Sequence, residues 1–454
     1  MTPQKLGKLR KARIQSVPEK KGDSREPFQK DRDRILYSSA LRRLDSITQV
    51  ISPIDGPTVH NRLTHAVKVA QLSRRIAERI LSEMKSGEQK RMLIAAGGLH
   101  PEVCDAAGLA HDLGHPPFGH VAEKVLNEKA RSCDESLKDG FEGNAQSFRI
   151  VTKLSVRLNT ESLNSSVKKW EEGLNLTRAT LNSLLKYPWK HERDDEIKSK
   201  KWGYYSQEQE IFDWVKKGMD HLGDRKTLEA EIMDWADDIA YSVHDTEDFF
   251  RLGKIPLDRL ANGDQKELEY FFRKAENNLR EYGPAVDIER CKLLFKKLMK
   301  NYCSIENPYY GTPTDRARLK QWASFLTGTY AKSISVHNDP SGQNGTVEID
   351  EAHRLQTIIL KQLTWVYVIK DPDLATVQEG QKKIVETLFD CLMENALGKD
   401  ANTYLFPPSF RDNLEQLHDK GEDYEKLKAR VVVDYIASMT ETEATTLYKR
   451  IMGI

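Results

Sequence analysis

The sequence of 454 residues has few of the features typical of secreted, membrane or disulfide-bonded proteins. It contains no run of about eighteen apolar residues and no apolar segment near its start, so we expect neither a membrane span nor a secretory signal. Its five cysteines are Cys104, Cys133, Cys291, Cys303 and Cys391. No two of them form a C-x-x-C pair, which disfavours a disulfide framework or a zinc ribbon. We therefore expect a cytoplasmic protein with no membrane partner.

Glycine-rich nucleotide-binding motifs and internal repeats are also absent. Without a P-loop or a dinucleotide-binding glycine motif, the P-loop and Rossmann classes are excluded. The composition is 39% hydrophobic and 31% charged, which is enough for a large buried core. The net charge of +1 hides a local excess of basic residues between positions 4 and 21. We predict that residues 1–27 form a basic, flexible arm, either simply solvated or in contact with an anionic partner.

The densest group of metal-binding residue types lies between Gly108 and Glu123. The residues before it have helical periodicity, and Pro116 and Pro117 lack the amide hydrogens that a helix needs. The helix should therefore end near Gly114, with His111 and Asp112 in its last turn. An imidazole and a carboxylate placed together suit Mn, Fe, Ni or Zn, so this pair predicts a metal site.

A second helix should begin after the two prolines, with His120 and Glu123 on one face of its first turn. A carboxylate bonded to one imidazole nitrogen raises the basicity of the other, which is an arrangement for general acid–base catalysis. The alternative is a glutamate favoured by the helix dipole beside a surface histidine. The neighbouring metal pair favours the catalytic interpretation.

Two other segments supply residues of the same kind. A long helix should begin near His60 and run to about Glu83, with Arg62 and His65 on one face. His65 is a candidate to complete the ligands of the predicted metal. Further along, Asp237, Tyr241 and Asp245 follow one another at four-residue spacing within an apolar helix. Burying such a row is costly unless a cation meets it, and a metal at Asp237 would provide one.

Helical periodicity continues through most of the remaining chain, so we predict an all-α fold. One interruption differs: residues 333–337 and 346–349 alternate as strands around a turn-rich segment, and we predict a small β-hairpin there. Near the start, residues 28–44 have helical spacing and carry four arginines: Arg32, Arg34, Arg42 and Arg43. Arginine matches phosphate oxygens, and the alternative is an exposed helix with local ion pairs.

Taken together, these motifs resemble the HD-domain superfamily of metal-dependent phosphohydrolases, and within it the bacterial deoxynucleoside triphosphate triphosphohydrolases, the deoxyguanosine triphosphatase (dGTPase) family. The match covers roughly residues 26–250. The matching segments are Asp31-Arg-Asp-Arg-Ile with Arg42-Arg-Leu, Thr48-Gln-Val, Asn61-Arg-Leu-Thr-His65, His111-Asp-Leu-Gly-His-Pro-Pro-Phe-Gly-His120, Glu142-Gly-Asn-Ala-Gln, Leu184-Leu-Lys-Tyr-Pro188 and Ala236-Asp-Asp-Ile-Ala-Tyr241. The resemblance implies an HD-domain helical phosphohydrolase core at residues 28–255 and a helical C-terminal region, residues 256–454, packed on it.

The resemblance also implies a role for each site residue. The metal ligands would be His65, His111, Asp112 and Asp237, and the ion a divalent cation, with Mn or Mg ahead of Fe, Ni, Co or Zn. His120 and Glu123 would form the acid–base pair, with His115 between them and the metal. Gln49 resembles the residue that holds the sugar 3′-hydroxyl. The phosphate or sugar contacts would be Arg62, Lys186, Tyr187 and Lys201, and the substrate-facing residues Tyr241 and Asp245.

The expected reaction is metal-dependent hydrolysis of dGTP or other dNTPs at the α-phosphorus, which yields a deoxynucleoside and inorganic triphosphate. One alternative is another HD phosphohydrolase that acts on nucleoside monophosphates or cyclic nucleotides. A different class of alternative is a nucleic-acid-binding protein that uses the basic arm. The resemblance further implies a homo-oligomer, a hexamer in many relatives, and allows single-stranded nucleic acid or a regulatory dNTP as partners.

Overall fold

The computed structural model describes residues 2–15, 22–50, 59–133, 139–158, 170–283, 286–303, 305–338, 345–396, 401–418 and 424–454. Within these ranges the protein is built from helices and two small antiparallel sheets, each of two strands, which confirms the predicted all-α class. None of the described helices has both the length and the apolar character needed to span a membrane.

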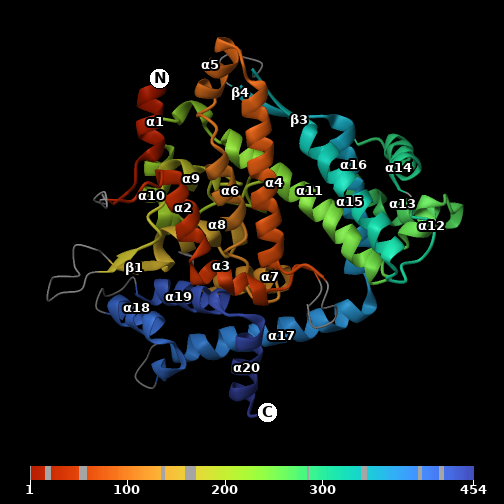
Figure 1. Ribbon diagram of the computed structural model, residues 1–454. Coiled ribbons are helices and arrows are strands. Elements are labelled where there is room, and N and C mark those ends of the chain that lie inside the picture. The colour runs from red at the N-terminus through yellow and green to blue at the C-terminus, as the bar shows by residue number, and fades with distance from the viewer. Residues whose placement is uncertain are drawn as a thin grey trace.

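Three helices form the centre of the molecule: α4 (Arg62–Glu83), α6 (Pro101–Ala110) and α11 (Leu228–Arg251) (Figure 1). The apolar stripe of α4 is buried against the other two helices. Helices α4 and α6 approach closely at Gly108, where an added Cβ would lie 2.5 Å from the Cα of Ala70. This close contact fixes the end of α6 relative to the start of α4.

Four helices extend this core through the second half of the chain: α13 (Gln265–Glu281), α14 (Ile288–Tyr302), α15 (Pro313–Lys332) and α16 (Glu351–Thr364). They share one continuous hydrophobic core with α4 and α11, so the core crosses the domain boundary predicted at residue 255. The predicted hairpin is confirmed, because β3 (Ile334–Asn338) pairs antiparallel with β4 (Gly345–Ile349). Residues 339–344 lie outside the described residues.

The last four helices form a separate layer, drawn in blue below the rest in Figure 1. They are α17 (Pro372–Asn395), α18 (Pro408–His418), α19 (Tyr424–Ser438) and α20 (Glu441–Met452). Their apolar side chains share a core with α7 (His120–Cys133) and with Phe118, which precedes α7. The C-terminal layer is therefore packed directly against the segment of the central histidine motif.

Shorter helices complete the fold: α1 (Pro3–Lys11), α2 (Pro27–Leu36), α3 (Ser39–Arg43), α5 (Gly87–Ala95), α8 (Gly143–Arg149), α9 (Arg178–Ser183), α10 (Gln209–Lys216) and α12 (Leu257–Ala261). Two five-residue π-helical segments extend α8 and α16: Ile150–Leu154 and Trp365–Ile369. Strands β1 (Val156–Leu158) and β2 (Trp170–Glu172) were not predicted. The single helix expected over residues 28–44 is divided, because the hydroxyl of Ser38 caps α3.

The prediction of a flexible arm is wrong for residues 2–15, although residues 16–21 lie outside the described residues. Helix α1 is packed on the core: Arg10 is buried, donates a 2.6 Å hydrogen bond to the carbonyl of Gly97 and forms an ion pair with Glu229. Arg13 forms a 2.6 Å ion pair with Asp31. These interhelical pairs occupy arginines that composition alone had suggested were solvated.

The arginines of residues 28–44 also have a structural role that neither sequence interpretation anticipated. Arg32 bonds to Asp105 on α6 over 2.9 Å, and Arg34 donates to the carbonyl of Leu174 over 2.9 Å. Arg43 donates to the carbonyls of Leu113 and His115, both over 2.7 Å. These three guanidinium groups hold neighbouring elements together, whereas Arg42 is exposed.

Candidate active site

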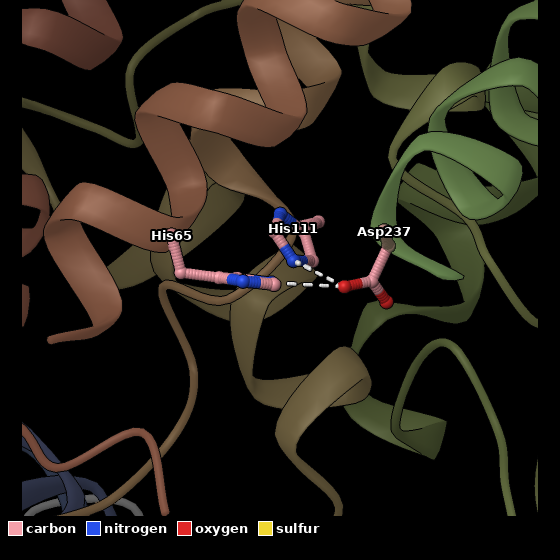
Figure 2. Close-up of side chains that lie close together, drawn as sticks. All are labelled: His65, His111 and Asp237. Atoms are coloured by element: carbon pink, nitrogen blue, oxygen red, sulfur yellow. Dashed lines mark hydrogen bonds and ion pairs between the residues drawn. The ribbon is translucent and has the colours of Figure 1, made fainter. Parts of the chain in front are cut away.

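Three side chains from the three central helices meet at one point (Figure 2). The Nε2 atom of His65 lies 2.9 Å from Oδ1 of Asp237, and Nε2 of His111 lies 3.7 Å from the same oxygen. One ligand atom from each residue lies within 4.8 Å of the other two. Both histidines are only 3% exposed. Residues separated by more than 170 positions in the chain thus form one trio of nitrogen and oxygen donors, in which both histidines are buried and Asp237 is half-buried.

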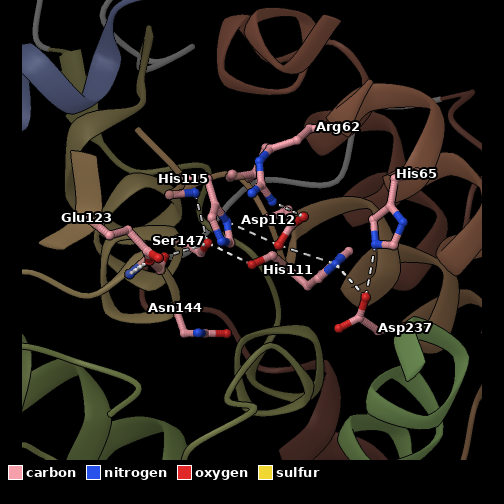
Figure 3. Close-up of polar contacts among 12 residues, drawn as sticks. Arg62, His65, His111, Asp112, His115, Glu123, Asn144, Ser147 and Asp237 are labelled. Atoms are coloured by element: carbon pink, nitrogen blue, oxygen red, sulfur yellow. Dashed lines mark hydrogen bonds and ion pairs between the residues drawn. The ribbon is translucent and has the colours of Figure 1, made fainter. Parts of the chain in front are cut away.

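Helix ends explain the positions of the two histidines. His65 lies in the first turn of α4, which Asn61 caps together with Thr64. His111 occupies the C-cap of α6, close to the predicted helix end. Its carbonyl accepts a 2.8 Å hydrogen bond from the hydroxyl of Ser147, which in turn accepts one of 2.9 Å from the amide of Gly114 (Figure 3). Ser147 therefore holds the turn that follows the histidine.

Asp112 lies beside this trio. Its Oδ1 is 3.4 Å from Nε2 of His111 and 3.1 Å from Nδ1 of His115, while its Oδ2 accepts a 2.8 Å bond from Arg62 (Figure 3). Burial works to raise the pKa of Asp112, but the two histidines and Arg62 hold it well below its ordinary value. All four residues predicted as metal ligands thus lie at one site as donors, three of them as a compact trio.

The donor set fits a divalent transition metal. Nδ1 of His111 lies 2.8 Å from the carbonyl of Gly108 and must donate to it, which leaves Nε2 as the ligand atom. Among the described residues this buried Nε2 has no hydrogen-bond partner. Two imidazoles with carboxylates suit such ions. Burial opposes a charge on His111, yet Asp112 and Asp237 raise its pKa to about 9, which shows how strongly the site favours a cation.

A second histidine–carboxylate group lies next to the first. Nδ1 of His120 is 2.5 Å from Oε2 of Glu123, and Oε1 of Glu123 accepts a 2.9 Å bond from the amide of Gly143. Burial tends to raise the pKa of Glu123, but Lys201, His120 and His115 keep it well below its ordinary value. The His115 and His120 rings are 5.7 Å apart. The structure brings together all three residues predicted for catalysis, with His115 between His120 and Asp112.

Both groups line a cavity of about 600 Å³. Six of the seven predicted substrate residues also line it: Gln49, Arg62, Lys186, Tyr187, Lys201 and Tyr241. Lys186 donates to Asp237 over 2.7 Å and pairs with Asp234 over 2.8 Å. Although burial disfavours its charge, these carboxylates raise the pKa of Lys186 well above its ordinary value. The cavity wall therefore keeps fixed positive charge beside the metal-type donors.

Asp245 is the exception among the predicted residues. It is buried, but it is absent from the cavity lining. Eight positions along α11 rotate a side chain by about 80° from Asp237 and move it about 12 Å along the axis. The four-residue spacing therefore keeps Tyr241 at the cavity and turns Asp245 away from it. Its proposed contact with substrate has no support in the cavity geometry.

Sequence reasoning missed two parts of the cavity. Asn144 lines it, and its amide donates over 2.9 Å to Glu142, the carboxylate that also binds Lys201 over 2.8 Å. Polar residues at the start of α8 were the available signal. The opposite wall comes from α17 and includes Asp373, Leu374, Val377, Gln378 and Gln381. On an amphipathic helix these residues look like an ordinary solvated face, so the sequence offered no signal for them.

Comparison with known proteins agrees with this architecture. Residues 62–242 match the HD domain, and residues 347–450 match the phosphohydrolase-associated domain. The chain is 37% identical over 95% of its length to a deoxyguanosinetriphosphate triphosphohydrolase-like protein of Corynebacterium efficiens, and covers 92% of that protein. It is 34% identical over 97% of its length to the protein of the same name in Streptomyces coelicolor, and covers 96% of it.

The chain belongs to the deoxyguanosinetriphosphate triphosphohydrolase-like family of HD-domain proteins. A third relative with the same name, from Bifidobacterium longum, is 32% identical over 94% of the chain, and the chain covers 83% of it. As a member of this family the protein is an HD phosphohydrolase with a helical HD fold. The trio of His65, His111 and Asp237 lies within the HD-domain match, and the α17 wall lies within the phosphohydrolase-associated match.

Proposed function

We propose that this protein hydrolyses deoxynucleoside triphosphates at the α-phosphorus and releases a deoxynucleoside and inorganic triphosphate. One observation carries the proposal: a single cavity is lined by the His65–His111–Asp237 trio, by His120, which Glu123 orients, and by three basic side chains, Arg62, Lys186 and Lys201. The names of the relatives, which refer to deoxyguanosine triphosphate, support dGTP as the first substrate to test.

His65, His111, Asp112 and Asp237 would hold the divalent cation. When bound, the cation would supply Lewis-acid polarisation of a phosphoryl oxygen. Arg62, Lys186 and Lys201 would neutralise the triphosphate, because fixed charges in a cavity shielded from water stabilise the added negative charge of the transition state. The polyphosphate is thereby held at the end of the cavity that carries both histidine groups.

His120 would move the proton. Its Nδ1 is engaged by Glu123, so Nε2 is the atom that exchanges a proton with the attacking water or with the leaving 5′-oxygen. The side-chain oxygen of Gln49 is buried at the cavity and has no hydrogen-bond partner within the described ranges, which suits it to accept a bond from the sugar 3′-hydroxyl. Tyr241 would pack against the sugar and leave no room for a 2′-hydroxyl.

Product analysis by chromatography tests the proposal. The purified protein is incubated with Mn²⁺ and each of the four dNTPs, singly and then as mixtures that allow for activation by a second dNTP. Intact triphosphate with a deoxynucleoside is the expected result. The His111→Ala variant should form neither product, whereas the matched His337→Ala variant, which alters an exposed histidine on β3, should behave as wild type.

Stepwise release of phosphate, or activity confined to nucleoside monophosphates or cyclic nucleotides, would instead support a different HD phosphohydrolase. The proposal of a nucleic-acid-binding arm is weakened, because Arg10 and Arg13 are engaged with carboxylates of the core. Three further points stay predictions: a hexameric assembly, activation by dNTP or single-stranded nucleic acid, and manganese or magnesium as the native ion.

A further inference from the structure

The loop between the two histidine groups has an unusual backbone. It runs from Gly114 to Gly119 and joins the end of α6, with His111 and Asp112, to α7, which begins at His120. Phe118 and Gly119 both have positive φ, at 67° and 59°. Residues with a side chain rarely adopt this left-handed conformation and keep it only where the surroundings impose it. The position of His120 therefore depends on what holds Phe118.

A carboxylate from the far end of the chain supplies that contact. Glu441, the first residue of α20, accepts a 3.2 Å hydrogen bond from the amide of Phe118 on its Oε1. The same oxygen accepts a 2.8 Å bond from the amide of Thr48, and Oε2 accepts a 2.9 Å bond from the Thr48 hydroxyl. Thr48 precedes Gln49, the candidate for binding the sugar. One carboxylate thus binds the two loops that carry His120 and Gln49.

The rest of the contact between α20 and the loop strengthens this interpretation. Arg43 donates to the carbonyls of Leu113 and His115 at the start of the loop, and to the carbonyl of Met439 just before α20 over 3.1 Å. The Phe118 side chain is buried in the core that it shares with α7 and the C-terminal helices. Side-chain hydrogen bonds from Arg43 and to Glu441 therefore tie both ends of the loop to the start of α20 and the residue before it.

We propose that Glu441 is a positioning residue that sets the distance between the proton-transfer group and the sugar-binding side of the cavity. The expected effect of Glu441 on the reaction rate rests on the proposed function. Its expected effect on the order of the two loops does not. The competing explanation is that Glu441 only stabilises α20 through the helix dipole. Glu443 separates the two, because it lies in the same first turn but, among the described residues, its side chain accepts hydrogen bonds from the amide and hydroxyl of the N-cap Thr440, over 2.7 and 3.0 Å, and none from the two loops.

Three variants test the proposal: Glu441→Ala, Glu441→Gln and the control Glu443→Ala. Backbone hydrogen exchange is measured by mass spectrometry on peptides covering residues 44–50 and 113–121, in protein free of metal and substrate. Steady-state kinetics with the preferred dNTP give kcat and KM, and thermal unfolding gives Tm. Glu441→Gln keeps the side-chain oxygen that accepts from both amides, so it serves as the conservative rescue.

We expect Glu441→Ala to accelerate exchange in both peptides at least tenfold and to lower kcat/KM about tenfold to a hundredfold, since small misplacements of catalytic groups are costly. Glu441→Gln should stay within about threefold of wild type. Glu443→Ala should lower Tm but leave both readouts within about twofold. The proposal would be overturned if Glu441→Ala left hydrogen exchange in both peptides unchanged. It would also be overturned if Glu441→Ala and Glu443→Ala lowered kcat/KM equally. A wild-type protein inactive on every dNTP would count against the proposed function. The hydrogen-exchange data would still decide whether Glu441 positions the two loops.

Discussion

Two histidine–carboxylate groups lie side by side in this protein, and we propose different chemistry for them although each consists of two histidines and one carboxylate. His65, His111 and Asp237 form one; His115, His120 and Glu123 form the other. In the first group both histidines are buried and the Nε2 of His111 has no hydrogen-bond partner among the described residues. In the second, the side chain of His120 is 73% exposed and its Nδ1 is already bonded to Glu123. Burial and an unused ligand atom favour metal binding, whereas an oriented, accessible imidazole favours proton transfer.

The largest effect is expected from His111→Ala, which removes a ligand from the first group. Both bound metal, measured by mass spectrometry of dialysed protein, and dNTP hydrolysis should fall below detection, a loss of at least about a thousandfold in rate. Full activity in a variant that retains no metal would remove the basis for assigning this group to the ion.

His120→Ala should separate the two functions. The variant should bind the same amount of metal as wild type, because the first group is untouched, while kcat falls by about a hundredfold to ten-thousandfold, the usual contribution of a general acid or base. Metal content and single-turnover rates measured on one preparation check this. If the variant also loses its metal, the second group is itself a metal site and the division proposed between the two groups is wrong.

The helix end that the sequence predicted near His111 is confirmed, and the reason is local. The Pro116-Pro117 pair ends a helix wherever it occurs, so His111 and Asp112 had to lie near a helix terminus. The α17 wall and Glu441 were not predictable, because their place at the cavity depends on how the C-terminal layer packs against α7, more than 200 residues away in sequence. Asp245 is absent from the cavity lining for a geometric reason, since a row of residues at four-residue spacing drifts around the helix.

A smaller effect is expected from Glu123→Gln. The amide keeps an oxygen for the amide of Gly143 but removes the negative charge beside His120, so the imidazole becomes a weaker base. The rate should fall about tenfold with little change in KM, as steady-state kinetics will measure. A rate within about twofold of wild type would show that the charge of Glu123 does not contribute to proton transfer.

The smallest effect concerns metal affinity and pH. Without metal, the pKa of His111 is raised to about 9 by Asp112 and Asp237 acting against burial, so the ring is protonated at neutral pH and must lose its proton to bind an ion. Affinity for Mn²⁺ should rise about tenfold per pH unit between pH 6 and 8 and level off above about 9. Calorimetric titration across this range checks the affinity, and a flat profile would show that His111 is already neutral.

The same shift in the pKa of His111 means that the metal-free protein loses stability as pH rises from about 6.5 through about 9.

The most direct test of the account is hydrolysis of the preferred dNTP in water enriched in ¹⁸O. Attack at the α-phosphorus, with proton transfer by His120, predicts one ¹⁸O atom in the released triphosphate and none in the deoxynucleoside. Label in the deoxynucleoside, or labelled monophosphate and diphosphate released stepwise, would contradict it, because the reaction would then take place at a different atom from the one that the two histidine groups are proposed to serve.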